Sequence, residues 1–324
     1  MINEGRIKDT LEDLFGKIEF PKEPKGLYDP LRYIMGLGGK RLRPALCLLT
    51  WSMYKDSFDN DILQAAAALE VFHNFTLIHD DVMDNAPTRR GKETVWKKWG
   101  NDTAILSGDV MCIESYRRLA GLSPAVLPAA LKLFNAMTAG ICEGQQLDMD
   151  FEALPKVSME DYMKMTGLKT ALLLATSARM GALVAGAPTY DCDLLYNFGY
   201  DLGLAFQIAD DYLDSFGDRN TFGKEIGGDI LEGKKTWLLV RALSKDEKTV
   251  QEALSMPTGT PELNKAKIVR FTELYRSLGV DEDARCEMGR LHSSALGHSE
   301  KIGLSKVKTE MLARYAGKLL GRNK

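Results

Sequence analysis

Two aspartate clusters share one spacing and one sequence context. Each has the pattern DDxxD after a long apolar segment, and together they comprise Asp80, Asp81, Asp84, Asp210, Asp211 and Asp214. On a helix, positions four apart lie on one face and a neighbour lies about 100° away, so we expect the carboxylates of each cluster to converge. Like charges repel at this distance, and a divalent cation would relieve the repulsion, with oxygen ligands favouring magnesium over zinc. One such cluster is compatible with a solvated helix end, whereas two with equal spacing and context indicate a metal site.

Basic residues lie near both clusters. Three of them precede a helix predicted to begin near Pro44, where their charges and the free backbone N–H groups can point at one anion. The candidate cations are Lys40, Arg41, Arg43, Arg89, Arg90, Lys169, Lys224, Lys234 and Lys235. Lys169 and Thr170 also begin an apolar helix. Any single cation is compatible with a solvated surface position, but their recurrence beside the carboxylates favours phosphate binding.

A histidine and a further aspartate lie on the same kind of helical face. His73 precedes Asp80 by seven residues, about two helical turns, so the two residues share a face. A lone histidine is more often a packed or capping residue, and both interpretations stay open here. Asp148, in GQQLDMD, is a third acidic position on a helical face, for which a helix-end charge is the alternative.

The segment GGDILEGKKT approaches the spacing of a nucleotide phosphate loop. Gly228 and Gly233 have the required separation and Lys234 follows, but Lys235 stands where that loop needs serine or threonine. The sequence predicts no strand before this segment and no alternation of strands with helices. We therefore exclude an ATPase.

Composition and charge exclude several other classes. The 324 residues are 45% hydrophobic, enough for a substantial core, and the formal net charge of −3 gives no indication of a nucleic-acid partner. The five cysteines are scattered without a CxxC pair, which indicates reduced thiols. The N-terminal segment lacks a signal-peptide pattern, and the longest apolar stretch, residues 170–188, carries Arg179 in its middle. We therefore expect a cytoplasmic protein without a transmembrane segment.

The periodicity of the apolar residues predicts an all-α fold. Apolar residues recur every three or four positions through most of the chain, and clean alternation is scarce. The breaks between these segments are short and rich in glycine and proline, so neighbouring helices should be antiparallel. There is no low-complexity linker. We expect one all-helical domain over residues 1–324.

Taken together, the motifs resemble the trans-isoprenyl diphosphate synthase family. GGKRLRP, LIHDDVMDNAPTRRG, GLKT, FQIADDYLD and GKEIGGDILEGKKT stand in that family's order and spacing, between Gly38 and about Leu239. The resemblance implies a large helical bundle of the isoprenoid synthase type with a central cavity. It also implies a homodimeric, short-chain trans-prenyltransferase that joins isopentenyl diphosphate to an allylic diphosphate.

The resemblance further implies a role for each residue singled out above. Three magnesium ions per active site would be held by Asp80, Asp84, Asp148 and Asp210, with Asp81, Asp211 and Asp214 in support. The allylic diphosphate would contact Arg89, Lys169, Lys224 and Lys234, with Gln207 nearby, and Thr170 is a further candidate for substrate binding. Isopentenyl diphosphate would contact Lys40, Arg43, His73 and Arg90. The basic tail residues Arg322 and Lys324 are candidates for closing the site.

The implied chemistry is ionisation of the allylic carbon–oxygen bond and attack of the isopentenyl double bond on the resulting carbocation. The departing diphosphate would accept the proton, and an apolar cavity would exclude water. A terpene cyclase generally has an Asn/Ser/Glu pattern in place of the second cluster, and a non-catalytic subunit of a heteromeric synthase would lack a cluster or a cation. This chain has both clusters intact. A metal–phosphate binding scaffold stays open as an alternative.

Product length is implied by the residues before the first cluster. Phe75, five residues before Asp80, would form the floor of the cavity, and the small Thr76 favours geranylgeranyl diphosphate, with twenty carbons, over farnesyl diphosphate, with fifteen. Helix geometry supports the depth but not the direction, because five residues rise about 7.5 Å yet place Phe75 roughly 140° from Asp80. Either the helix is bent or the prenyl tail runs beside it.

Overall fold

The computed structural model describes residues 2–217 and 226–321. The chain divides into two compact units: unit 1 comprises residues 1–134 and 176–196, and unit 2 comprises residues 135–175 and 197–324. Three long helices contribute residues to both units: α7 (Leu127–Glu152), α9 (Leu172–Val184) and α10 (Thr189–Phe216). The single domain expected over residues 1–324 stays a prediction.

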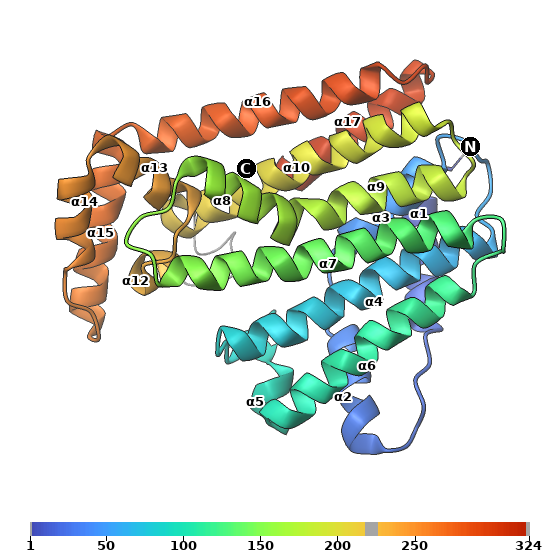
Figure 1. Cartoon of the computed structure of the whole chain (residues 1–324), viewed down its shortest axis with the longest axis horizontal. Coiled ribbons are helices and arrows are strands. Elements are labelled where there is room, and N and C mark those ends of the chain that lie inside the picture. Colours follow the sequence, from blue (N-terminus) through green and yellow to red (C-terminus); the bar gives the residue numbers. More distant parts are fainter. Residues whose placement is uncertain (1, 218–225, 322–324) are drawn as a thin grey trace. The chain divides into compact units, whose positions relative to one another are not determined.

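Unit 1 contains most of the N-terminal helices (Figure 1). They are α1 (Glu4–Gly16), α2 (Lys25–Gly36), α3 (Leu42–Trp51), α4 (Asn60–Met83), α5 (Val95–Trp99) and α6 (Asn101–Ala120), with the strands β1 (Thr88–Arg89) and β2 (Lys92–Glu93) between α4 and α5. The helices α4 and α6 pack side by side. Asp59 caps α4 by accepting a hydrogen bond from the backbone N–H of Ile62 at 3.1 Å. The buried run Ala65–Leu69 shows that α4 is central to this unit.

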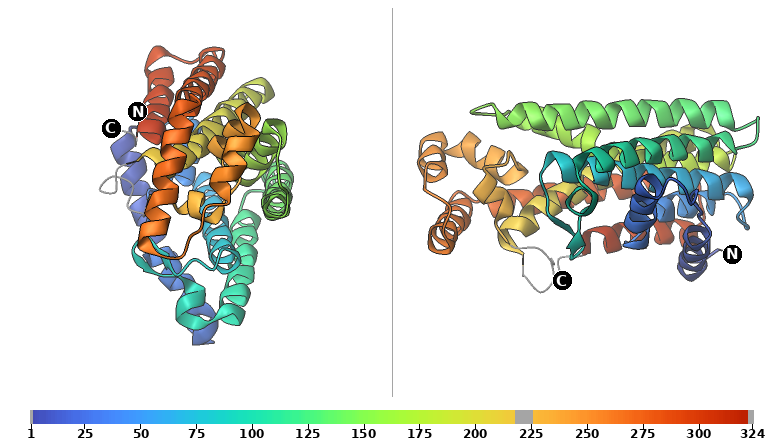
Figure 2. Two further views of the ribbon diagram at one scale, coloured as in Figure 1. Left: turned by 90° about the vertical axis from the view of Figure 1, so that its left-hand side faces the viewer. Right: turned by 90° about the horizontal axis from the view of Figure 1, so that it is seen from below.

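Unit 2 contains the C-terminal helices, coloured green to red in Figures 1 and 2. Besides its parts of α7, α9 and α10 it has α8 (Met159–Thr166), the π-helical turn η1 (Gly167–Ala171), α12 (Gly228–Glu232), α13 (Trp237–Lys245), α14 (Glu247–Leu254), α15 (Pro261–Ser277), α16 (Val280–Glu300) and α17 (Lys306–Leu320). The helix α15 packs against α12, α14 and α16. Fully or nearly fully buried apolar side chains of α10, α13 and α15, among them Ile208, Leu238 and Phe271, build the core of this unit.

The all-α prediction is confirmed, with one short hairpin as an addition. Thr88 pairs with Glu93 and Arg89 with Lys92. The connecting residues Arg90 and Gly91 have φ values of 53° and 72°, as a two-residue type I′ turn requires. Strands of two residues are too short to produce the alternation by which a sequence reveals a strand. Within the described ranges, no helix is long and apolar enough to cross a membrane.

Candidate active site

In unit 1 the first aspartate cluster lies at the end of α4, as predicted, but its carboxylates differ in environment. Asp81 is buried and binds Arg89 with two nitrogens: Nε lies 2.9 Å from both carboxylate oxygens, and Nη2 lies 2.7 Å from Oδ1. Asp80 is half-buried, and Asp84 is exposed at the C-cap of the helix. Asp81 thus departs from the expected convergence, because its place round the helix directs it to the arginine of the hairpin.

The turn of the hairpin places a second arginine against the glycine-rich loop between α2 and α3. Arg90 donates a hydrogen bond from Nη1 to the carbonyl oxygen of Gly38. Its guanidinium lies against Gly39, where an added Cβ would come within 2.9 Å of the Arg90 Cζ. A side chain is also disfavoured at Gly39 by its φ of 143°. Burial lowers the pKa of Arg90, yet a guanidinium stays charged at physiological pH.

The side chains of the three cations in GGKRLRP lie in different environments. Lys40 is exposed and Arg43 is half-buried. Arg41 is directed into unit 1, where Nη1 donates to Glu70 Oε1 at 2.6 Å and Nη2 donates to the carbonyl oxygen of Met35 at 2.8 Å. The sequence suggested that all three cations can address one anion. A buried carboxylate engages Arg41, and the assignment of that role to Lys40 and Arg43 stays a prediction.

His73 on α4 is subject to the charges of the arginines described above. Its imidazole pKa is well below the usual 6.5, first because of burial and then because of four guanidinium groups, those of Arg43, Arg89, Arg90 and Arg41. The buried carboxylates Glu70 and Asp81 accept hydrogen bonds from two of these arginines. A site at which several guanidinium groups act on one imidazole suits a polyanion. A neutral His73 can donate a hydrogen bond to such an anion without adding charge.

The two predicted chain-length residues lie one turn before the aspartates. Phe75 is half-buried and packs against the apolar cluster of unit 1, with its ring centroid 5.2 Å from that of Phe72 and 4.7 Å from that of His79. Thr76 donates a hydrogen bond from Oγ1 to the carbonyl oxygen of His73 at 2.8 Å. The helix α4 is α-helical throughout, from Asn60 to Met83. The role of these residues in product length stays a prediction.

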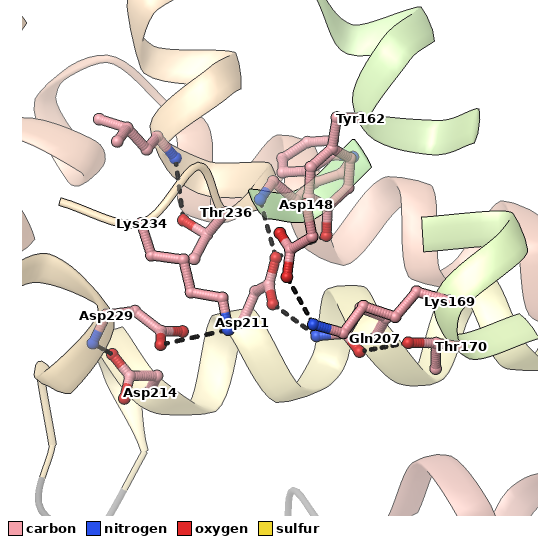
Figure 3. Close-up of polar contacts among 12 residues, drawn as sticks. Asp148, Tyr162, Lys169, Thr170, Gln207, Asp211, Asp214, Asp229, Lys234 and Thr236 are labelled. Atoms are coloured by element: carbon pink, nitrogen blue, oxygen red, sulfur yellow. Dashed lines mark hydrogen bonds and ion pairs between the residues drawn. The ribbon is translucent and has the colours of Figure 1, made fainter. Parts of the chain in front are cut away.

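In unit 2 an ion pair joins α7 to the π-helical turn (Figure 3). Lys169 Nζ lies 2.5 Å from Asp148 Oδ2, and both side chains are largely buried. π-Helical turns are frequent at functional sites, because the wider turn redirects a side chain. Gly144, one turn before Asp148, permits the close approach of α7, since an added Cβ would lie only 2.4 Å from the backbone nitrogen of Lys169.

The second residue of the second aspartate cluster anchors the surrounding elements. Asp211 is 4% exposed and accepts hydrogen bonds from Tyr162 Oη at 2.6 Å, Gln207 Nε2 at 2.9 Å and the backbone N–H of Trp237 at 2.8 Å. Thr170 donates to Gln207 Oε1 at 2.9 Å, which extends the network to η1. Burial, followed by the charge of Asp229, raises the pKa of Asp211 to about 6.

The third residue of this cluster fastens the segment that resembled a phosphate loop. Asp214 Oδ2 accepts a hydrogen bond from the backbone N–H of Asp229 at 3.1 Å, and its carbonyl oxygen accepts one from Gly227 at 2.7 Å. The short helix α12 lies between two glycines in left-handed conformation, Gly227 and Gly233. Lys234 follows, with Nζ 3.9 Å from Asp229 Oδ1. This helix–turn arrangement agrees with the exclusion of a nucleotide phosphate loop.

These groups line a cavity of about 60 Å³ within unit 2, which has room for small polar groups such as water molecules or phosphate oxygens. Its lining combines carboxylates with cations and includes Asp148, Lys169, Gln207, Asp211, Lys234 and Lys235. Lys224, which the resemblance assigned to the allylic diphosphate, lies outside the described residues, as do Arg322 and Lys324.

The residues fit a divalent cation that binds together with a phosphate ligand. Within residues 2–217 and 226–321, no three His, Cys, Asp or Glu side chains converge as a metal-binding group. The candidate ligands Asp80, Asp84, Asp148 and Asp210 offer carboxylate oxygens only, the donors that magnesium prefers. Magnesium commonly takes one or two protein carboxylates and completes its shell with water and substrate phosphates. A site without a preformed cage therefore agrees with the donor set.

Sequence reasoning missed three residues of these networks: Glu70, Tyr162 and Asp229. Glu70 had a usable signal, because a single carboxylate inside the apolar run AAAALEVF must be paired when the helix is buried. Tyr162 and Asp229 had none, since their partners are 49 and 15 residues away and depend on packing.

Comparison with known proteins gives one consistent result. The polyprenyl synthetase family model matches residues 24–271. The short chain isoprenyl diphosphate synthase of Methanothermobacter thermautotrophicus is 34% identical over 310 residues, covering 95% of this chain and 89% of the relative. A crystal structure of a geranylgeranyl pyrophosphate synthase has a TM-score of 0.94 and 40% identity, with both chains fully covered. A polyprenyl synthase from Caulobacter crescentus CB15, solved with calcium and isoprenyl diphosphate, has a TM-score of 0.85 and 26% identity, covering 99% of this chain and 96% of the other. The chain belongs to the polyprenyl synthetase family and is a prenyltransferase.

Proposed function

We propose that this enzyme condenses isopentenyl diphosphate with allylic diphosphates to give geranylgeranyl diphosphate, with farnesyl diphosphate as the alternative product. The observation that carries the proposal is that each aspartate cluster has a cation nearby. Arg89 binds Asp81 in unit 1; in unit 2, Lys234 lies near Asp229, whose backbone N–H donates to Asp214. Each unit thus presents carboxylates for metal and cations for phosphate. The similar proteins are prenyl synthases, which supports this function over terpene cyclisation.

We assign isopentenyl diphosphate to the cationic group of unit 1. Lys40, Arg43 and Arg90 would neutralise the diphosphate, and the neutral His73 would donate a hydrogen bond. Guanidinium groups suit this role because they bind phosphate oxygens in a bidentate manner.

We assign the allylic diphosphate to Arg89 in unit 1 and to Lys169, Lys234 and the Thr170–Gln207 pair in unit 2. Lys169 pairs with Asp148 at 2.5 Å. On binding, the diphosphate would contact the ammonium group of Lys169, and a divalent cation would contact the carboxylate of Asp148. The contacts of Asp211 hold Gln207 and the start of α13 in place, which fixes the loop that carries Lys234.

Magnesium is the cation that we assign to Asp80, Asp84, Asp148 and Asp210, with three ions per active site. When bound, it supplies positive charge that stabilises the leaving diphosphate. The lysines and arginines act in the same direction, because their positive charge stabilises the additional negative charge that the diphosphate acquires when the allylic carbon–oxygen bond breaks.

The reaction then forms one carbon–carbon bond. The isopentenyl double bond attacks the allylic carbocation, and the proton lost from the adduct passes to the released diphosphate. The residues of unit 1 orient isopentenyl diphosphate for this attack, and Phe75 with Thr76 would limit the growth of the product. A homodimer in the cytoplasm remains part of the proposal.

The test is incubation of the purified protein with radiolabelled isopentenyl diphosphate, magnesium and an allylic primer, followed by chromatography of the dephosphorylated products. Labelled twenty-carbon alcohol is expected. Cyclic hydrocarbons would indicate a cyclase, and absence of any labelled product would indicate a scaffold or a non-catalytic subunit.

A further inference from the structure

Arg41 and Glu70 form a buried ion pair that neither the metal sites nor the substrate contacts assigned above use. Their closest atoms are 2.6 Å apart, and their side chains are 14% and 3% exposed. Removing a carboxylate and a guanidinium from water is unfavourable unless the pair is well satisfied. Here it is: Arg41 also donates to the carbonyl oxygen of Met35 at 2.8 Å, and Asn74 Nδ2 lies 3.4 Å from Glu70 Oε1.

The pair ties the glycine-rich loop to three helices. Met35 lies on α2, directly before the loop, and Glu70 lies on α4. The Arg41 guanidinium also lies 4.8 Å from the ring centroid of Phe15 on α1. The backbone of Arg41 begins α3, since its carbonyl oxygen accepts the N–H of Ala45 at 3.0 Å. One side chain thus fixes the loop relative to the helices around it.

Arg41 holds an uncommon backbone conformation to do so. Its φ of 47° is in the left-handed region, which costs a non-glycine residue energy and persists where surrounding contacts determine it. The contacts to Glu70 and Met35 are such determinants.

The residues assigned to isopentenyl diphosphate are attached to the two backbones that this pair joins. Lys40 precedes Arg41 directly, and Arg43 follows two residues later. On α4, His73 lies three residues after Glu70, which is less than one turn. Arg90 donates to Gly38 in the same loop. The distance between the loop cations and His73 therefore depends on the Arg41–Glu70 contact.

We propose that Arg41 and Glu70 are positioning residues that hold the loop cations and His73 at the spacing required by the diphosphate of isopentenyl diphosphate. This inference rests on the proposed function, and on the assignment of Lys40 in particular. The alternative is that Arg41 binds the substrate directly, and loss of affinity in an Arg41 variant alone does not separate the two roles. A variant of Glu70 does separate them, because Glu70 is negatively charged like the substrate and therefore does not itself attract the diphosphate.

The experiment measures kcat and both KM values for Arg41→Ala, Arg41→Lys, Glu70→Gln and Lys40→Ala. We expect Arg41→Ala and Glu70→Gln each to raise the KM for isopentenyl diphosphate roughly 10- to 100-fold, the scale of a misplacement of about 1 Å, with the allylic KM changed less than about twofold. Arg41→Lys should restore part of the affinity. The control Glu114→Gln removes a similarly buried carboxylate of unit 1 that pairs with Arg117 on α6, and it should leave both KM values unchanged.

A Glu70→Gln variant that binds isopentenyl diphosphate normally or more tightly, beside an impaired Arg41→Ala, would show direct binding by Arg41 and overturn the inference. Equal losses for both substrates would show a structural role only. If Arg41→Ala does not fold, the near-isosteric Glu70→Gln and Arg41→Lys give the same decision. If Lys40→Ala leaves the KM for isopentenyl diphosphate unchanged, the assignment of that substrate fails instead.

Discussion

Substituting alanine for Gly144 should impair use of the allylic substrate, although Gly144 has no polar side chain that could contact this substrate. An added Cβ would lie 2.4 Å from the backbone nitrogen of Lys169 and 2.8 Å from Leu168 Cβ, whereas ordinary contacts begin near 3.4 Å. Backbone cannot yield by a rotamer change, so α7 and η1 must separate by about 1 Å. Over-packing of this kind costs about 1–3 kcal/mol. It would also lengthen the 2.5 Å contact between Lys169 and Asp148.

The assay is steady-state kinetics with the allylic diphosphate varied at saturating isopentenyl diphosphate. We expect kcat/KM for the allylic substrate to fall roughly 10- to 100-fold, since displacement of about 1 Å at a charged site has effects of that size. Gly140→Ala is the matched control on the same helix, because its Cβ would meet the end of the flexible Leu172 side chain, which can rotate away. Wild-type kinetics for a folded Gly144→Ala, or equal impairment by Gly140→Ala, would refute the reasoning.

Three further outcomes test the assignment of roles. Asp80→Ala and Asp210→Ala should each lower kcat by a factor of about 10² or more with little loss of folding. Excess chelator should abolish turnover by the wild type, and activity that survives the chelator would exclude metal dependence. Lys40→Ala should chiefly raise the KM for isopentenyl diphosphate, whereas Lys169→Ala should impair use of the allylic substrate; interchangeable effects would contradict the two assignments. Phe75→Ala should give longer products by chromatography, and unchanged product length would remove Phe75 as the floor of the cavity.

The sequence was sufficient for the fold class because helix formation is mostly a local matter. Apolar spacing and short breaks predicted helices throughout, and the DDVMD cluster was correctly expected at the end of α4. The hairpin at Thr88–Glu93 was not predicted, since it depends on two left-handed residues at its turn and on no repeating pattern.

Side-chain contacts between residues far apart in the sequence could not be predicted in the same way. Arg41 was counted among cations that address an anion, and only its place against Glu70, 29 residues away, shows that the protein itself engages it. The contact of Tyr162 with Asp211, across 49 residues, likewise depends on how α8 packs beside α10. Charge type and spacing therefore predict which residues are candidates, whereas packing decides which partners in the protein each of them has.

The two aspartate clusters illustrate this division within a single motif. In each, the second aspartate is buried and bound by protein donors: Asp81 by Arg89, and Asp211 by Tyr162, Gln207 and the backbone of Trp237. The first aspartate of each cluster, Asp80 and Asp210, is half-buried instead. A carboxylate that already accepts three hydrogen bonds has little capacity left for a metal, but it fixes the helix end and the cations beside it. The repeated DDxxD spacing thus combines one structural carboxylate with the adjacent aspartate that we propose as a metal ligand.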